Sequence, residues 1–305
     1  MTRTLLSVAT VLAVLYTLWI ALVPVMNIKW EVSQAQRAGA EVWIPESGIR
    51  TAGNWQVLAG NLSLIPGTYA QEKPRLPSPG QVFAELWDTT AGKKITSKRS
   101  LIYHAQVTLS ATLLGFGMGT VLGMLLAIGI VHVRALDASV MPWAIASQTI
   151  PILAIAPMII VVMNSVGITG LVPKAIISAY LSFFPVVVGM VKGLRSPDAM
   201  QMDLLRTYSA SPTQTFWKLR LPAALPFLFP SLKIGIAAAL VGAIVGELPT
   251  GAVAGLGARL LAGSYYGQTI QIWSALFGAA IVAALLVGLI GLIQNLLLKH
   301  MGLAR

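Results

Sequence analysis

Long apolar runs separated by shorter polar segments make up most of this chain. A helix needs about 20 apolar residues to cross the hydrocarbon core of a bilayer. Six stretches meet this requirement: 5–25, 105–131, 140–163, 169–191, 227–247 and 271–298. The first is longer than the apolar core of a signal peptide, which is roughly 7–15 residues. The pattern therefore predicts an all-α membrane protein with six transmembrane helices, the first of them retained over residues 1–26.

A polar segment, 27–100, separates the first two apolar runs. It contains turn-forming pairs such as Pro66-Gly67 and four tryptophans: Trp30, Trp43, Trp55 and Trp87. Because disordered linkers contain few aromatic residues, we expect this segment to be ordered over one surface of the membrane.

The distribution of basic residues predicts the orientation of the chain. With a cytoplasmic N-terminus, six spans place both termini inside. The inside segments then hold the basic residues Arg3, Arg134, Lys192, Arg195, Arg206, Lys218, Arg220, Lys299 and Arg305. The short outside loops, 164–168 and 248–270, hold only Arg259. This difference agrees with the rule that cytoplasmic loops carry an excess of Lys and Arg.

One group of basic residues conflicts with this orientation. The basic cluster lies on the predicted outside, just before the second apolar run, and consists of Lys93, Lys94, Lys98 and Arg99. Long loops translocate largely regardless of their charge, so the short loops decide the orientation. The cluster fits either a solvated loop or a surface that favours an anion or an acidic partner protein.

The second apolar run carries small residues at a spacing of four. Gly115, Gly119 and Gly123 lie on one face of a helix and are followed by Ala127. Such a face lets the backbone of another membrane helix approach closely. The alternative is that glycine is simply frequent in membrane helices, and Gly117 interrupts the pattern.

Prolines interrupt the third and fourth runs, at Pro142, Pro151, Pro157, Pro173 and Pro185. Proline removes a backbone donor and kinks a helix. In a membrane, the freed carbonyl groups are tolerated where they are buried in protein or line a water-filled path. The prolines therefore favour a transport protein over a purely structural bundle.

The composition supports a membrane protein and excludes several other classes. The 305 residues are 56% hydrophobic and 10% charged, whereas soluble domains carry about 25% charged residues. Basic residues at helix ends explain much of the net charge of +11, so nucleic acid is not an expected partner. Because the chain has no cysteine, it has no disulfide, thiolate metal site or cysteine nucleophile.

The polar loop 192–222 is predicted to face the cytoplasm and to contain two short helices. Ser196-Pro197-Asp198 combines a hydroxyl cap, a proline at the first helical position and an acidic residue. Ser211-Pro212 repeats the cap and the proline. One face of the first helix is apolar and carries Met200, Leu204, Leu205 and Tyr208. Such a face indicates either a partner protein or a helix that lies on the lipid headgroups.

The same loop resembles the Glu-Ala-Ala loop of the permease subunits of binding-protein-dependent ABC importers. That pattern runs Glu-Ala-Ala, three residues, Gly, nine residues, Ile, any residue, Leu-Pro. Its positions are occupied here by Asp203-Leu204-Leu205, Ser209, Leu219 and Leu221-Pro222. Other stretches resemble the branch that imports nitrate, sulfonate, taurine or bicarbonate: Leu76-Pro77-Ser78-Pro79, Thr149-Ile150-Pro151-Ile152 with Ala156-Pro157, Leu221-Pro222-Ala223-Ala224-Leu225-Pro226, and Glu247 with Gly255-Leu256-Gly257. The resemblance covers residues 76–300 and leaves 27–75 as an insertion.

The resemblance implies a type I ABC importer permease fold in a bacterial inner membrane, with both termini cytoplasmic. Residues 1–26 would form the first transmembrane helix, 27–100 an extended periplasmic loop, and 101–300 a permease core of five helices. The implied partners are two ABC ATPase subunits, a second permease chain and a periplasmic solute-binding protein. ATP and Mg²⁺ would bind to the ATPase subunits, so this chain would hold no cofactor or metal and would not be an enzyme.

In that family the loop carries a coupling helix seated in a groove of the ATPase subunit. The resemblance assigns this role to Asp203, Leu204, Leu205, Arg206, Tyr208, Ser209, Ala210, Ser211 and Pro212. Leu204 and Leu205 are bulkier than alanine, which implies a wider groove in the partner.

The family's translocation path is lined mainly by the third to fifth spans. Polar residues in those spans make Gln148, Thr149, Tyr180 and Glu247 the candidates for lining it. The alternative is that such side chains bond within the protein, for example Glu247 with Arg259 at the outer rim.

Two other classes fit the sequence less well. A secondary transporter driven by an ion gradient often shows inverted repeats and buried charges at the midplane, and neither is evident. An intramembrane enzyme needs a nucleophile that faces a base, and the sequence lacks Gly-x-Ser-x-Gly. It also lacks the nucleotide-binding pattern Gly-x-x-x-x-Gly-Lys-Ser/Thr. The expected function is passage of a small solute by alternating access, with secondary transport as the alternative.

Overall fold

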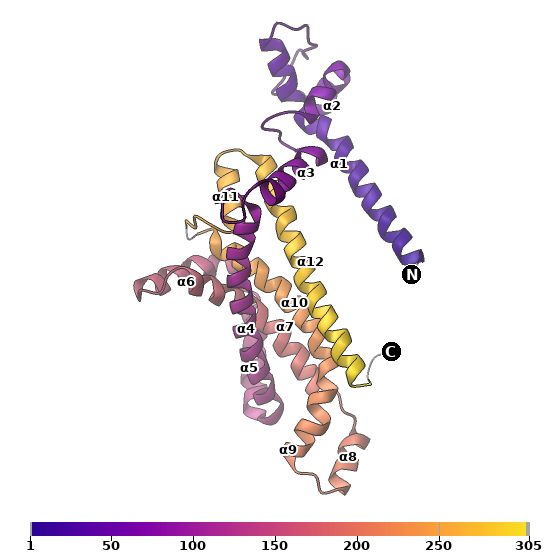
Figure 1. The fold of residues 1–305 in the computed structure, drawn as a ribbon, viewed down its shortest axis with the longest axis vertical. Helices are drawn as coiled ribbons and strands as arrows, with labels where there is room; N and C mark the ends of the chain where they lie inside the picture. Colours follow the sequence, from indigo (N-terminus) through magenta and orange to yellow (C-terminus); the bar gives the residue numbers. More distant parts are fainter. Residues whose placement is uncertain (1, 250, 303–305) are drawn as a thin grey trace. The chain divides into compact units, whose positions relative to one another are not determined.

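The computed structural model describes residues 2–249 and 251–302, so Arg305, one of the basic residues assigned to the inside, lies outside it. Every regular element in these residues is helical (Figure 1), which confirms the predicted all-α class. The long helices are α1 (Thr2–Arg37), α4 (Leu101–His132), α7 (Leu171–Leu194), α10 (Leu221–Glu247) and α12 (Thr269–His300). The shorter helices are α2 (Asn54–Gly60), α3 (Pro79–Trp87), α5 (Arg134–Ser147), α6 (Ile152–Ser165), α8 (Ala199–Thr207), α9 (Pro212–Thr215) and α11 (Leu256–Tyr265). Single turns complete the set: η1 (Leu62–Leu64), η2 (Pro66–Tyr69), η3 (Asp88–Gly92) and η4 (Phe216–Arg220).

Five helical segments are long and apolar enough to cross a membrane, and a bent pair of helices is a sixth candidate. The bent pair corrects the prediction of one continuous helix over 140–163. Here α5 and α6 meet at 101° (Figure 1), on either side of residues 148–151. Pro151 ends the ladder of backbone hydrogen bonds because it has no N–H group. A second difference concerns α1, which continues to Arg37 instead of ending near residue 26.

The chain forms two compact units. The N-terminal unit consists of residues 1–101 and 259–277, and the core unit consists of residues 102–258 and 278–305. Each unit has its own packing.

The N-terminal unit is built on the part of α1 that follows its apolar run. Val25, Ile28 and Val32 of α1 pack against Val57 and Leu58 of α2. This cluster orders the segment that the sequence predicts to be an insertion, and its aromatic content had indicated such order.

Asn27 of α1 holds the far end of that segment. Its fully buried amide nitrogen donates to the carbonyl groups of Thr68 and Leu76, at 3.0 and 2.8 Å. Its side-chain oxygen accepts from the backbone N–H groups of Arg75 and Leu76, at 2.9 and 3.1 Å. All the bonding capacity of this amide is therefore used, and residues 68–76 are fixed against α1.

In the core unit, α7 packs between α4 and α10, and glycines make both contacts close. A Cβ atom at Gly119 of α4 would lie 2.9 Å from the carbonyl oxygen of Ala179 on α7, and one at Gly123 would lie 2.8 Å from the carbonyl oxygen of Phe183. On the other side, a Cβ atom at Gly242 of α10 would lie 2.7 Å from the Cα atom of Ser178. Such separations are shorter than any real Cβ contact, so side chains larger than hydrogen are excluded there.

Gly115 provides a test of the contact between α4 and α7. A Cβ atom at this position would collide with the carbonyl oxygen of Ala175. Replacing Gly115 by valine should therefore force the helices apart and destabilise the fold by about 3 kcal/mol, the upper end of the usual cost of overpacking. The measurement is the thermal unfolding temperature of the purified protein in detergent. Gly117→Val on the same helix points into open space and is the matched control; an equal loss in both variants would contradict the assignment.

Candidate functional site

The first helix of the loop 192–222, α8, begins at Asp198. The Asp198 carboxylate accepts from the N–H of Gln201 at 2.7 Å, and the Gln201 side-chain oxygen accepts from the N–H of Asp198 at 3.2 Å. This reciprocal pair is a capping box. Ser196, the predicted cap, instead donates its hydroxyl to the Gly193 carbonyl at 2.7 Å, at the end of α7. The predicted start was wrong because a glutamine stands three positions after Asp198, whereas Ala199 stands three positions after Ser196.

The second helix begins at Ser211, as predicted. The Ser211 hydroxyl accepts from the N–H of Gln214 at 3.2 Å, and the Gln214 side chain accepts from the N–H of Ser211 at 2.9 Å. Pro212 occupies the first helical position, where its missing N–H has no cost. The helix then continues through η4 into α10, and Phe216 packs on the core of the unit with its ring 5.6 Å from that of His132.

Between these helices the chain turns at Ser209, which has a φ of 54°. The N–H of Ser209 donates to the Arg206 carbonyl at 2.9 Å, and the N–H of Ala210 donates to the Leu205 carbonyl at 3.0 Å. This pair of bonds is a Schellman motif, whose left-handed position is usually glycine. The importer pattern has glycine at this position, so the geometry gives a physical reason for that preference.

The α8 helix presents an apolar ridge to its surroundings. This apolar ridge consists of Met200, Leu204 and Tyr208, which are four residues apart and 81%, 57% and 77% exposed. Leu205, which the sequence placed on the same face, is half-buried. Beside the ridge, Asp203 and Arg206 form an exposed ion pair at 3.0 Å. In Figure 1, α8 and α9 lie at the end of the core unit where α7 ends and α10 begins.

Three of the four predicted path residues meet at the break between α5 and α6. Gln148 and Thr149 lie in the break and are exposed, and Tyr180 of α7 reaches it from the side. The Tyr180 hydroxyl donates to the Ser147 carbonyl. In an unbroken helix that carbonyl would accept from residue 151, which is proline. Tyr180 therefore satisfies the carbonyl group that Pro151 leaves free.

Glu247, the fourth predicted path residue, lies elsewhere and is fully buried. Its carboxylate accepts from the Thr108 hydroxyl at 2.9 Å and from the N–H of Gly257 at 2.7 Å. The N–H of Leu256 donates to the Thr108 hydroxyl at 2.8 Å, and the N–H of Gly255 donates to Nδ1 of His104 at 3.0 Å. Three consecutive N–H groups at the start of α11 are thus held by side chains of α4 and α10.

The sequence did not identify this arrangement. His104 and Thr108 precede Glu247 by more than a hundred residues, and no spacing rule connects them. Gly255, with a φ of 128°, leaves no room for a Cβ atom beside the Glu247 carboxylate. In the sequence, the two glycines that follow Glu247, at positions 255 and 257, were the one indication of this arrangement.

Arg259, the alternative partner for Glu247, instead lies with its guanidinium 3.9 Å from the carboxylate of Glu85. Burial lowers the pKa of the Arg259 guanidinium, and the charge of Glu85 opposes that shift.

Comparison with known proteins identifies relatives along most of the chain. Residues 119–302 match the family model described as "Binding-protein-dependent transport system inner membrane component". A riboflavin transport system permease of Chloroflexus aurantiacus is 33% identical over 224 residues, which cover 73% of this chain and 80% of the relative. A formylaminopyrimidine transport permease of Halalkalibacterium halodurans is 32% identical over 182 residues, or 60% and 68% of the two chains. A putative aliphatic sulfonates transport permease of Bacillus subtilis is 26% identical over 245 residues, or 80% and 82%.

The left-handed conformation of Ser209 predicts a stabilising substitution. A non-glycine residue in the left-handed region lowers the stability of the fold by about 1 kcal/mol. Ser209→Gly should therefore slow hydrogen exchange of the amides at the end of α8 by about fivefold. Hydrogen–deuterium exchange of peptides from 199–215 measures this effect. Ser211→Gly makes the same change at a φ of −67° and removes the cap of α9, so it should accelerate exchange. Equal effects of the two substitutions would contradict the role of backbone conformation.

The buried carboxylate of Glu247 predicts a different pair of effects. Glu247→Ala leaves the N–H of Gly257 and the hydroxyl of Thr108 without this acceptor in a buried site, which should cost about 3 kcal/mol. Glu247→Gln keeps one acceptor oxygen and should cost less than half as much. Thermal unfolding in detergent measures both, and exchange at residues 255–257 locates the change. A Glu247→Ala protein of unchanged stability would show that these bonds contribute nothing.

Proposed function

This chain belongs to the family of binding-protein-dependent transport system inner membrane components, and we propose that it is the permease subunit of an ATP-driven importer of a small solute. The family consists of multi-pass membrane subunits of ABC transporters whose ATPase is a separate subunit. The observation that carries the proposal is the apolar ridge of α8, on a loop whose two helices are capped by their own residues.

The ridge favours a protein partner over the lipid headgroups. A helix that lies on an anionic membrane surface carries Lys and Arg along its polar face. Here the residues beside the ridge are Asp198, Asp203 and Arg206, and the one cation is already paired with Asp203. The apolar and nearly uncharged face of α8 therefore suits a groove in an ATPase subunit, where burial of Leu204 and Tyr208 would supply the binding free energy.

The coupling residues proposed from the sequence fall into three groups in this geometry. Leu204 and Tyr208 are exposed and would contact the ATPase. Ser209, Ala210, Ser211 and Pro212 form the turn and the cap that set the angle between α8 and α9. Leu205 is half-buried and would pack beneath the contact, and Asp203 and Arg206, paired with each other within α8, would lie at its edge.

The transport step would be alternating access between two permease chains. ATP and Mg²⁺ on the two ATPase subunits would close the ATPase dimer and move both coupling helices, and hydrolysis would reset them. Since α8 follows α7 after only four residues, displacement of α8 acts directly on α7 and on the Tyr180 contact. Gln148 and Thr149, exposed at the break, would line the path, and Glu247 would brace the start of α11.

A periplasmic solute-binding protein would select the solute. The relatives carry names that refer to riboflavin, formylaminopyrimidine and aliphatic sulfonates, which differ in size and charge. Permeases of one family can serve such different solutes if recognition is made largely by a separate protein. The neutral side chains at the break, Gln148, Thr149 and Tyr180, fit a path that does not itself select for charge.

The docking role of Leu204 is tested by charge substitution. Leu204→Glu places a carboxylate on the ridge, and an unpaired buried charge in the contact should lower ATPase affinity at least a hundredfold. The measurement is copurification of the ATPase subunit with the tagged permease, followed by solute uptake in proteoliposomes. Leu62→Glu is the matched control, because Leu62 is 62% exposed but lies in the N-terminal unit.

Leu204→Lys distinguishes the two partners of the ridge. Both charges would disrupt a protein groove, whereas a lysine would strengthen contact with anionic headgroups. Loss of ATPase binding in both Leu204 variants, with Leu62→Glu unaffected, is the expected result. Normal binding and uptake in Leu204→Glu would refute the docking role.

A further inference from the structure

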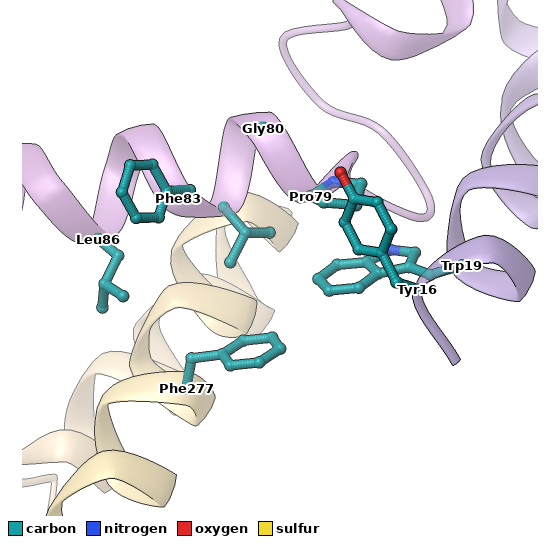
Figure 2. A pocket seen from close by; sticks show the side chains of 8 residues that line it. Tyr16, Trp19, Pro79, Gly80, Phe83, Leu86 and Phe277 are labelled. Atoms are coloured by element: carbon teal, nitrogen blue, oxygen red, sulfur yellow. The ribbon is translucent and has the colours of Figure 1, made fainter. Parts of the chain in front are cut away.

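Two cavities take no part in the transport cycle proposed above. The aromatic cavity lies in the N-terminal unit, has a volume of about 420 Å³ and is lined by side chains of α1, α3 and α12. Figure 2 shows α3 passing across its opening, with Phe277 directed toward Trp19, and their rings stack at 5.6 Å. None of the described residues that line it is charged, so the aromatic cavity does not indicate the chemistry of a ligand.

The second cavity, the basic pocket, lies in the core unit and has a volume of about 230 Å³. Its basic side chains come from three elements: His132 ends α4, Arg206 lies on α8 and Arg220 ends η4. The other lining residues that the structure describes are uncharged: Met202, Ala210, Pro212 and Thr215. The Thr215 hydroxyl donates to the Ser211 carbonyl at 3.1 Å, so the side-chain donors that remain for a ligand are those of the basic residues.

The carboxylates of this part of the chain already have partners. Three acidic residues lie between α4 and α10 in the sequence: Asp137, Asp198 and Asp203. Asp137 pairs with Arg195 at 2.8 Å, and the Asp198 carboxylate caps the start of α8. Asp203 pairs with Arg206 at 3.0 Å through one guanidinium nitrogen, which leaves the other nitrogens of Arg206 able to donate.

Arg220 and His132 keep nitrogens that the described residues do not bind. Arg220 is half-buried, and no hydrogen bond or ion pair from a described residue reaches its guanidinium. Nδ1 of His132 lies 2.8 Å from the Ile128 carbonyl oxygen, which can only accept, so Nδ1 carries a hydrogen. Nε2 then donates only when the ring is charged, the form that a bound anion stabilises. Because a half-buried charge without a counter-charge costs free energy, the basic pocket favours a negatively charged ligand.

The basic pocket lies on the face of α8 opposite the apolar ridge. Each residue turns an α-helix by about 100°, so Met202 and Arg206 lie about 200° around α8 from Met200 and Leu204. The ridge is the face that the ATPase would cover, whereas the basic pocket lies behind it, against the end of α4. An anion that enters from solution or from a lipid headgroup therefore fits the pocket better than a side chain of a protein seated on the ridge.

We propose that the basic pocket binds a phosphate group and that the bound phosphate ties α8 to the end of α4 and the start of α10. The planar guanidinium groups of Arg206 and Arg220 match pairs of phosphate oxygens. A water molecule needs only about 10–15 Å³ of cavity space, so the pocket has room for a tetrahedral oxyanion and its first waters. The proposal goes beyond the proposed function, because binding requires neither the ATPase nor the solute.

Two sources supply the same chemistry: inorganic phosphate and the headgroup of an anionic phospholipid. An adjoining cavity of about 260 Å³ shares His132 and Pro212 with the basic pocket and is otherwise lined by Ile128, Thr213 and Phe216. A phospholipid would place its glycerol end there, whereas inorganic phosphate would leave that cavity to water. Both probes are therefore needed to identify the source.

Hydrogen–deuterium exchange of the full chain, in a detergent without phosphate, tests the proposal. Sodium phosphate at ten times its Kd should slow exchange in peptides from 199–215 about tenfold, whereas sodium chloride at equal ionic strength should not. Dihexanoylphosphatidylglycerol is the second probe. Protection by inorganic phosphate assigns the pocket to the free anion, and protection by the lipid alone assigns it to a headgroup. Protection by neither probe, or equal protection by chloride, would overturn the proposal.

Substitutions in and beside the pocket locate the effect. Arg220→Gln removes one of the two guanidinium groups and should lower the affinity for the protecting probe at least tenfold. Lys218→Gln is the matched control, because it removes a positive charge from the same turn but is exposed and lies outside the pocket; its affinity should be unchanged. Arg206→Gln, on the exposed surface of α8, should give a similar loss and replaces Arg220→Gln if that variant has a lower unfolding temperature.

Two results from these variants would contradict the site. Equal losses in Lys218→Gln and Arg220→Gln would reduce the effect to nonspecific attraction between charges. Weaker copurification of the ATPase with Arg220→Gln, without protection by either probe, would assign the pocket to an acidic side chain of the ATPase instead.

Discussion

Close approach of α7 to its two neighbours is the constraint on which the rest of the core unit depends. In hydrocarbon, helices gain little from burying apolar surface, because lipid tails are as apolar as leucine. Association must come from van der Waals contact, which requires backbones to approach closely. Gly119 and Gly123 of α4 meet the α7 backbone on one side, and Gly242 of α10 meets it on the other. An added methyl group at any of these positions would separate the helices.

The break between α5 and α6 and the exposed ridge of α8 are both attached to this central helix. Tyr180 projects from the middle of α7 to the break between α5 and α6, where it satisfies the Ser147 carbonyl. The end of α7 leads through Asp198 into α8 and its exposed ridge. The contacts on both sides of α7 fix it within the core unit, so the break at Tyr180 and the loop that carries α8 are joined by one continuous helix.

Hydropathy alone predicted the helical class and the five long apolar helices, because each span must satisfy the hydrogen-bonding groups of about 20 backbone residues within lipid. It could not predict that α5 and α6 meet at 101°. Pro151 indicates an interruption, but the direction of the bend depends on a hydroxyl group from another helix. The length of α1 was also missed, since its last turns are polar on their outer side and their apolar residues are buried by a cluster that includes Ala52, Val57 and Leu58. The aromatic cavity required three segments, α1, α3 and α12, to be placed together, and no local pattern encodes that arrangement.

Backbone groups at helix ends and breaks have no partner within their own helix. Where these groups lie explains which of their partners could be predicted from the sequence. In the loop, which water reaches, caps come from neighbours: Asp198 binds the N–H of Gln201, and Ser211 binds that of Gln214. In the membrane-spanning part, partners come from far along the chain. Tyr180 binds the carbonyl group of Ser147, and His104 and Thr108 bind N–H groups at the start of α11. A helix end in water can rely on solvent and needs only a weak local cap, whereas one surrounded by hydrocarbon must find a protein partner, wherever that residue lies in the sequence. The loop therefore folds from its own residues, whereas the geometry at the break depends on the helices around it. The docking role proposed for α8 and the path proposed at the break thus belong to two regions that are stabilised in different ways.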